Sequence, residues 1–260
     1  MIALNDLLAT GSGSLVGFAL GLLGGGGSIL ATPLLLYVVG VRSPHVAIGT
    51  GALAVAANAF ANLIAHSRAG NVKWPCAAVF AASGIVGAFT GAALGKAVDG
   101  NKLLFLFGLV MVAVAMAMLS PRAASGDPDV RINPAIGIRL ILIGLLVGLL
   151  SGFFGIGGGF LIVPGIMLGS GMAAINAVGS SLISVGAFGL TTALTYAIDG
   201  LIDWRVAAFF ILGGVLGGLA GVSLSSRMAK QRTLLTRSFA LAVCAVAALV
   251  LWRSAPAFFG

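Results

Sequence analysis

Two glycine-rich segments interrupt hydrophobic stretches of the chain, and their backbone is the first candidate for binding chemistry. One runs from Gly24 to Ser28 and the other from Gly155 to Gly159, 131 residues later. Glycine is a poor helix former, so each run frees backbone N–H and C=O groups. Unwound backbone inside a bilayer is tolerated only where protein buries it or where it lines a cavity. Matching interruptions in two halves indicate the substrate site of a secondary transporter.

The chemistry that such breaks offer is anion binding by backbone. A half-helix starting at Ser28 or Gly159 would present unpaired N–H groups and the positive end of its dipole, and glycine would let an anion approach closely. No Lys, Arg, Asp or Glu falls in the middle of the apolar segments near 46–66, 75–95, 176–198 or 205–225. A small oxyanion would therefore be held by backbone and by hydroxyl and amide side chains, without a buried cation.

Polar side chains recur at four-residue steps in the segment that follows each break. The first series includes Thr50, Asn58, Asn62 and His66. Residues four apart share one face of a helix, and polar groups within a membrane face the protein interior or a water-filled cavity. The functional interpretation is a stripe that flanks the breaks and lines the substrate pathway. The structural alternative is hydrogen bonding between packed helices, which we prefer for Ser184, Thr191 and Thr195.

These patterns assign residues to three roles: proton coupling, helix packing and substrate binding. His66 is the candidate for proton coupling, although a hydrogen-bonded structural histidine is the alternative. Glycines at spacings of three or four, such as Gly84 and Gly214, predict close helix packing instead. The predicted substrate-binding residues are those of the breaks and of the two polar stripes: Gly24, Gly25, Gly26, Gly27, Ser28, Thr50, Asn58, Asn62, Gly155, Gly157, Gly158, Gly159, Ser180, Ser181 and Thr192.

The composition is that of a multi-pass membrane protein. Sixty percent of the residues are hydrophobic, 8% are charged, and the mean hydropathy is +1.16. The net charge of +8 comes from cations in short loops, which indicates topology rather than nucleic-acid binding. Two cysteines and two histidines give no metal or haem spacing, and neither glycine run continues into a phosphate-binding Lys-Ser or Lys-Thr, so we expect no cofactor.

The chain also contains an internal repeat that extends beyond the breaks. Pro33 aligns with Pro164, and after a one-residue gap Trp74 aligns with Trp204. Ala-Ile-Gly-Thr at 47–50 matches Ala-Val-Gly-Ser at 177–180. The glycine positions that align are Gly17 with Gly148, Gly21 with Gly152, Gly40 with Gly171, Gly70 with Gly200, Gly84 with Gly214, Gly87 with Gly217 and Gly91 with Gly221.

The repeat divides the chain into a first membrane unit over 1–120, a linker over 121–134 and a second membrane unit over 135–260. The linker is rich in proline and polar residues. The stretches after the breaks, near 28–41 and 159–172, are shorter than the roughly 20 residues that span a bilayer, as expected for half-helices. The longer apolar segments lie near 7–23, 46–66, 75–95, 103–119, 136–154, 176–198, 205–225 and 234–252.

The distribution of Lys and Arg discriminates between two topologies. If each broken stretch were one kinked span, the loops would carry seven cations on each side. If each formed a hairpin, one side would hold nine cations and the other five: Arg42, Lys96, Lys102, Arg205 and Arg253. The positive-inside rule favours the hairpin, two inverted repeats and both termini outside the cytoplasm.

These motifs together resemble the sulfite exporter TauE/SafE family. The resemblance rests on the paired glycine breaks, on the segments at 47–50 and 177–181, and on the Gly-to-Trp loops at 70–74 and 200–204, and it covers about residues 12–252. It implies an inner-membrane carrier of sulfite, thiosulfate or organosulfonates, with export favoured over uptake. The two copies differ because Ile156 stands opposite Gly25 and Ser28 stands opposite Gly159.

We therefore expect an all-α membrane protein of two inverted repeats, each with a glycine-broken hairpin and three transmembrane helices. It would carry a small sulfur-containing anion across the bacterial inner membrane by alternating access around a midplane site. The alternatives are an anion channel of the same architecture and a carrier of a non-sulfur anion; we expect no enzyme activity. Proton and sodium coupling both stay open, as does a homo-oligomer.

Overall fold

The structure is a computed structural model that describes residues 4–119, 126–127, 130–155, 159–227 and 232–256. The described chain is almost entirely helical, and each apolar segment expected from the sequence is a helix. The elements are α1 (Leu4–Leu23), η1 (Gly24–Leu30), α2 (Ala31–Leu34), η2 (Leu35–Val39), α3 (Pro44–Arg68), α4 (Trp74–Ala97), α5 (Gly100–Leu119), α6 (Pro134–Phe154), α7 (Gly159–Ser170), α8 (Ala174–Ala197), α9 (Trp204–Arg227) and α10 (Arg232–Ser254).

Seven helical stretches in the described residues are long and apolar enough to cross a membrane. Side-chain burial divides them into two groups. The most apolar windows of α3 and α8 are 67% and 72% buried, whereas that of α6 is only 33% buried and exposes leucines and isoleucines along its outer face. The protein is thus an all-α integral membrane protein, with α3 and α8 at its centre and α6 facing lipid.

The first glycine run is wound more tightly than expected. We expected the short helix to begin near Ser28, but Gly24–Leu30 forms a 3₁₀ helix that continues directly into α2 and then into one π-helical turn, η2. The break is therefore confined to Gly24, whose φ of +71° is a left-handed conformation that glycine adopts without strain. In the second half α7 covers Gly159–Ser170, directly after the undescribed residues 156–158.

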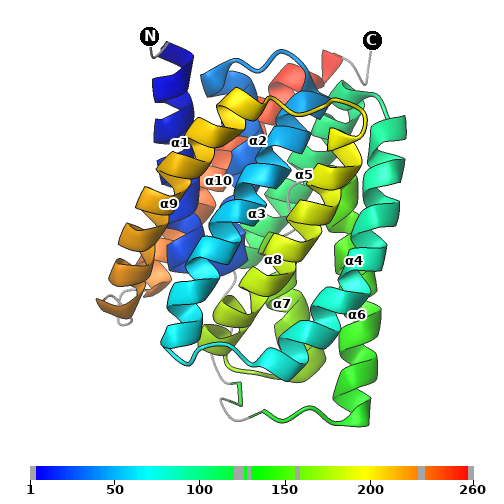
Figure 1. Ribbon diagram of the computed structural model, residues 1–260, viewed down its shortest axis with the longest axis vertical. Helices are drawn as coiled ribbons and strands as arrows, with labels where there is room; N and C mark the ends of the chain where they lie inside the picture. The colour runs from blue at the N-terminus through cyan, green and yellow to red at the C-terminus, as the bar shows by residue number, and fades with distance from the viewer. Residues whose placement is uncertain (1–3, 120–125, 128–129, 156–158, 228–231, 257–260) are drawn as a thin grey trace.

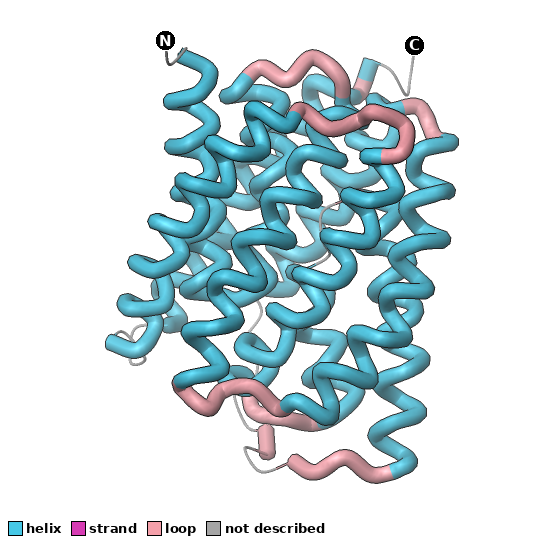
Figure 2. The backbone as a smooth tube through the Cα atoms, in the orientation of Figure 1, coloured by secondary structure: helices cyan, strands magenta, loops and turns pink. Residues whose placement is uncertain are grey.

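The loops gather at the two ends of the helical bundle (Figure 2). The loops that join η2 to α3, α4 to α5 and α8 to α9 lie at the upper end in Figure 1, together with the start of α1. The loops that join α3 to α4 and α7 to α8, and the segment before α6, lie at the lower end. This is the loop arrangement of the hairpin alternative; the inverted repeat itself stays a prediction.

Glycines let two pairs of helices cross closely, α1 with α9 and α4 with α6. A Cβ atom at Gly17 would collide with the backbone of Gly214, and one at Gly148 would collide with the backbone of Gly84. Of these four glycines, Gly84 and Gly214 were expected to serve close packing, and Gly17 aligns with Gly148 as Gly84 aligns with Gly214. Without side chains in between, the helix backbones can touch.

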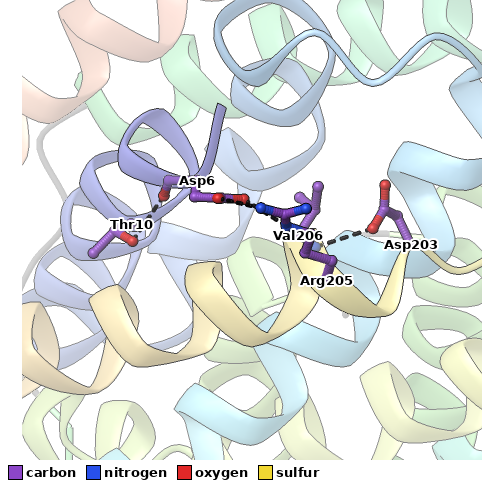
Figure 3. Close-up of polar contacts among 5 residues, drawn as sticks. All are labelled: Asp6, Thr10, Asp203, Arg205 and Val206. Atoms are coloured by element: carbon purple, nitrogen blue, oxygen red, sulfur yellow. Dashed lines mark hydrogen bonds and ion pairs between the residues drawn. The ribbon is translucent and has the colours of Figure 1, made fainter. Parts of the chain in front are cut away.

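An ion pair joins α1 to α9 at the upper end of the bundle. Arg205 donates from Nε and Nη2 to the two carboxylate oxygens of Asp6, at 3.0 and 2.7 Å, and the Asp6 side chain is buried (Figure 3). Asp203 caps the start of α9 by accepting from the N–H of Val206. A second ion pair, between Lys96 and Asp199, joins α4 to the loop after α8. Both pairs link the two halves of the chain.

Candidate functional site

The two glycine breaks meet each other in the interior of the bundle. A Cβ atom at Gly25 would collide with the backbone of Gly159, and one at Gly159 would collide with the backbone of Gly25. Both glycines are buried. Segments 134 residues apart in the sequence are therefore in direct backbone contact. This contact explains why neither position can carry a side chain in the observed arrangement.

The helices α3 and α8, which follow the two breaks, form the walls of this site. Each of them packs against the break of the other half of the chain. A Cβ at Gly24 would press on Val178 of α8, and one at Gly155 would press on Ile48 of α3. Gly24 and Gly155 both have left-handed φ angles, +71° and +66°. Ile48 and Val178 occupy equivalent positions of the repeat, so the two walls are built in the same way.

The remaining glycines of the first run differ in how closely protein covers them. A Cβ at Gly27 would collide with the backbone of Ala19 and Leu20, so α1 covers that position. Among the described residues, the atom nearest to a Cβ at Gly26 would be Leu23 Cβ, 3.9 Å away, which leaves room for a side chain or a ligand. Ser28 is buried, and its hydroxyl donates to Gly25 O at 2.9 Å. Two predicted residues, Gly157 and Gly158, lie outside the described residues.

Asn58 and Asn62 lie where α3 crosses α9. A Cβ at Gly214 would touch the amide of Asn58, and one at Gly218 would touch the amide of Asn62. Both asparagines are buried, and neither amide atom of Asn58 has a hydrogen-bond partner among the described residues. A buried polar group without a partner costs free energy, so such a group in a native protein needs a reason. A polar ligand at Asn58 would supply one.

Thr50 and Ser180 have structural partners instead. The Thr50 hydroxyl accepts from the N–H of Asp203 at 2.9 Å, and the Ser180 hydroxyl accepts from the N–H of Lys73 at 2.9 Å. The Thr50 hydroxyl therefore links the loop before α9 to α3, and the Ser180 hydroxyl links the loop before α4 to α8. Their predicted contact with substrate stays untested, but the hydrogen bonds account for both hydroxyls without it.

Three further predicted residues are buried in the bundle. Ser181 Oγ would lie 3.3 Å from a Cβ at Gly24 and donates to Val178 O, one turn back along α8. Thr192 is buried, and its hydroxyl has no hydrogen-bond partner among the described residues. His66 Nε2 lies 3.3 Å from Gly21 O, so the ring connects α3 to the last turn of α1. That contact fits the structural alternative for His66, and its part in proton coupling is untested.

Sequence reasoning missed two buried hydroxyl groups near the breaks. Thr32 of α2 would lie 3.6 Å from a Cβ at Gly51 of α3, and Ser151 precedes the break at Gly155 by one turn of α6. Neither hydroxyl has a partner among the described residues. The repeat could not reveal them, because the aligned positions are Val163 and Leu20. Their signal is a lone hydroxyl in an apolar segment beside a glycine break.

This architecture defines a class of protein. A multi-pass helical bundle in which two glycine-broken segments meet between central helices is typical of a membrane transporter. Comparison with known proteins gives the same class. The family model described as sulfite exporter TauE/SafE matches residues 9–250, and the chain belongs to this family.

Relatives with similar lengths carry the same general description. A probable membrane transporter protein of Xylella fastidiosa is 53% identical over 97% of this chain and 98% of its own length. Probable membrane transporter proteins of Bacillus subtilis and Haemophilus influenzae are each 25% identical, over 88% and 90% of this chain and 89% and 94% of their own. No solved structure matches. The chain is a membrane transporter and a multi-pass protein of the bacterial inner membrane.

Proposed function

We propose that the protein exports small sulfur-containing oxyanions, such as sulfite, thiosulfate or organosulfonates, by secondary transport. The observation that carries the proposal is the contact between Gly25 and Gly159, because it joins two helix starts from the two halves at one point. The N–H groups at the start of a helix favour negative charge. The sulfur-anion class and the export direction follow from the description of the family.

The substrate site in this proposal is made of backbone and neutral polar groups. The first N–H groups of η1 belong to Gly24, Gly25 and Gly26, and Gly26 is the position with free space beside it. Asn58 supplies an amide without a partner among the described residues. Buried N–H and amide donors bind an oxyanion by charge-assisted hydrogen bonds, which are stronger than hydrogen bonds between neutral groups.

Alternating access would come from the rocking of two inverted repeats around this site. The repeat is supported by the glycines with left-handed φ among the described residues. They form three pairs at the repeat spacing: Gly24 with Gly155, Gly40 with Gly171, and Gly70 with Gly200. The same backbone conformations thus recur at equivalent positions. The inverted orientation of the two repeats is supported by the loops in Figure 1, because the loop from η2 to α3 lies at the same end of the bundle as the start of α1.

Flux in proteoliposomes tests the proposal. We expect saturable sulfite flux that is stimulated by sulfite on the opposite side, because a carrier exchanges its substrate. Gly26→Ala and Gly26→Val should abolish flux while the melting temperature of the purified protein stays within a few degrees of that of the parent, because the added atoms enter free space. Flux without saturation or counterflow would indicate a channel, and full activity of both variants would refute the site.

A further inference from the structure

A polar cavity, away from the glycine breaks, opens at the upper end of the bundle. It has a volume of about 260 Å³ and lies between η2, the start of α3, the start of α5 and the end of α10. Two arginines, Arg42 and Arg253, line it together with Tyr37, Asn101 and Ser254. Among the described residues, no aspartate belongs to its lining. The cavity therefore has a positive charge that none of the described lining residues neutralises.

The two guanidinium groups are available to a ligand. Neither Arg42 nor Arg253 forms an ion pair with a described residue. Asp99, which precedes the cavity residue Asn101 by two positions, accepts from the N–H groups of Asn101 and Lys102 and so caps α5. Arg253 lies with Cζ 5.4 Å from the centre of the Tyr37 ring, a cation–π contact that holds this side chain beside the cavity.

The positions of these arginines are not explained by membrane topology. By the count of Lys and Arg, the upper end is the side outside the cytoplasm, and the positive-inside rule disfavours cations there. At the lower end, the described residues equivalent to Arg42 carry no arginine. There the repeat aligns Arg42 with the Met172–Ala173 region, where the backbone of Asp127 pairs with Gly171 and Ala173. Arg42 thus has no arginine counterpart among the described residues of the lower end.

We infer that this cavity binds an oxyanion group outside the cytoplasm. Arginine presents its N–H donors in a planar fork that matches a tetrahedral or pyramidal oxyanion, and two arginines at one cavity suit a doubly charged one. The group is either a free sulfur oxyanion or the phosphate of an anionic lipid. The free-anion case rests on the proposed function, since the cavity would then receive the exported substrate; the lipid case does not.

The test compares Arg42→Gln, Arg253→Gln and the double variant with Lys102→Gln. Lys102 is a fair control because it is exposed in the first turn of α5 beside the cavity but does not line it. Calorimetric titration of the purified protein with sulfite and with sulfate measures free-anion binding. Native mass spectrometry with added phosphatidylglycerol measures retention of the anionic lipid. Arg42 and Arg253 are exposed, so their variants should melt within a few degrees of the parent protein.

Each outcome has a separate meaning. We expect the double variant to bind either the free anions or the lipid about tenfold or more weakly than the parent protein, which is the size of a lost charge-assisted hydrogen bond. Binding by Lys102→Gln should stay within about twofold of that of the parent protein. Weaker sulfite or sulfate binding identifies a free anion, and lost phosphatidylglycerol identifies a lipid. Equal binding of all three ligands by the double variant and Lys102→Gln overturns the inference. Because both readouts are independent of flux, a failure of the proposed transport activity leaves this test intact.

Discussion

Gly25 and Gly159 show how far the sequence predicts the roles of individual residues of the site. The sequence predicts that both lie in functional breaks, because glycine runs in apolar helices need a reason. It does not predict that they touch, since contact between segments so far apart depends on tertiary packing. Nor does a polar residue's position in a stripe reveal its partner. Thr50 and Asn58 belong to one stripe, yet the Thr50 hydroxyl accepts a hydrogen bond from a loop, whereas the Asn58 amide has no partner among the described residues.

Asn58→Leu separates a ligand contact from a structural one. The substitution removes a buried amide without a described partner, which relieves an unfavourable group by about 1–3 kcal/mol. We expect an unchanged or higher melting temperature together with a large loss of sulfite flux in proteoliposomes. Ser184→Ala is the control, because its hydroxyl is also buried and without a described partner but was assigned to helix packing. If Asn58→Leu transports sulfite normally, Asn58 has no part in the site.

Thr50→Val should give the opposite result. Valine keeps the shape of the side chain but removes the oxygen that accepts from the N–H of Asp203, and an unsatisfied backbone donor costs about 1–3 kcal/mol. We expect a lower melting temperature in detergent and unchanged KM for sulfite. Thr50→Ser keeps the acceptor and should restore the stability. A raised KM in a variant of normal stability would return Thr50 to the substrate site.

The sequence predicts the positions of the helices better than it predicts their type, α, 3₁₀ or π. The apolar segments and their approximate ends could be found from hydropathy, because about 20 apolar residues span a bilayer. The 3₁₀ winding of η1 and the π-helical turn of η2 could not, since a four-glycine run has little conformational preference and neighbouring helices decide its path. The crossing of α1 with α9 was likewise hidden, although the spacing of their glycines predicted that some close crossing exists.

Two glycines of α1 provide an internal comparison for this crossing. Gly17 touches Gly214, whereas a Cβ at Gly11 would meet nothing within 4 Å. Gly17→Ala should lower the melting temperature, because overpacking against backbone costs about 1–3 kcal/mol. Gly11→Ala should keep or raise it, because alanine favours the helix by up to about 1 kcal/mol. Equal effects of the two variants on melting temperature would show that the backbone contact contributes nothing to stability.

The orientation of the complete bundle follows from nine Lys and Arg on one side and five on the other. We expect the loop between η2 and α3 to lie outside the cytoplasm and the loop between α3 and α4 to lie inside. In a background without Cys76 and Cys244, Ser43→Cys should react with an impermeant maleimide in intact cells. Asn71→Cys should react only after permeabilisation. The reverse pattern of labelling would invert the orientation and turn the Arg42 and Arg253 cavity toward the cytoplasm.

The joining of the two breaks into one oxyanion site is best tested by ligand-dependent melting of the purified transporter. A ligand that binds only the folded protein raises the melting temperature with its concentration. We predict that sulfite or thiosulfate raises the melting temperature of the parent protein selectively over chloride. Gly26→Val should melt like the parent without ligand but lose that shift, because its side chain occupies the free space beside the break. An undiminished shift in Gly26→Val would contradict the account.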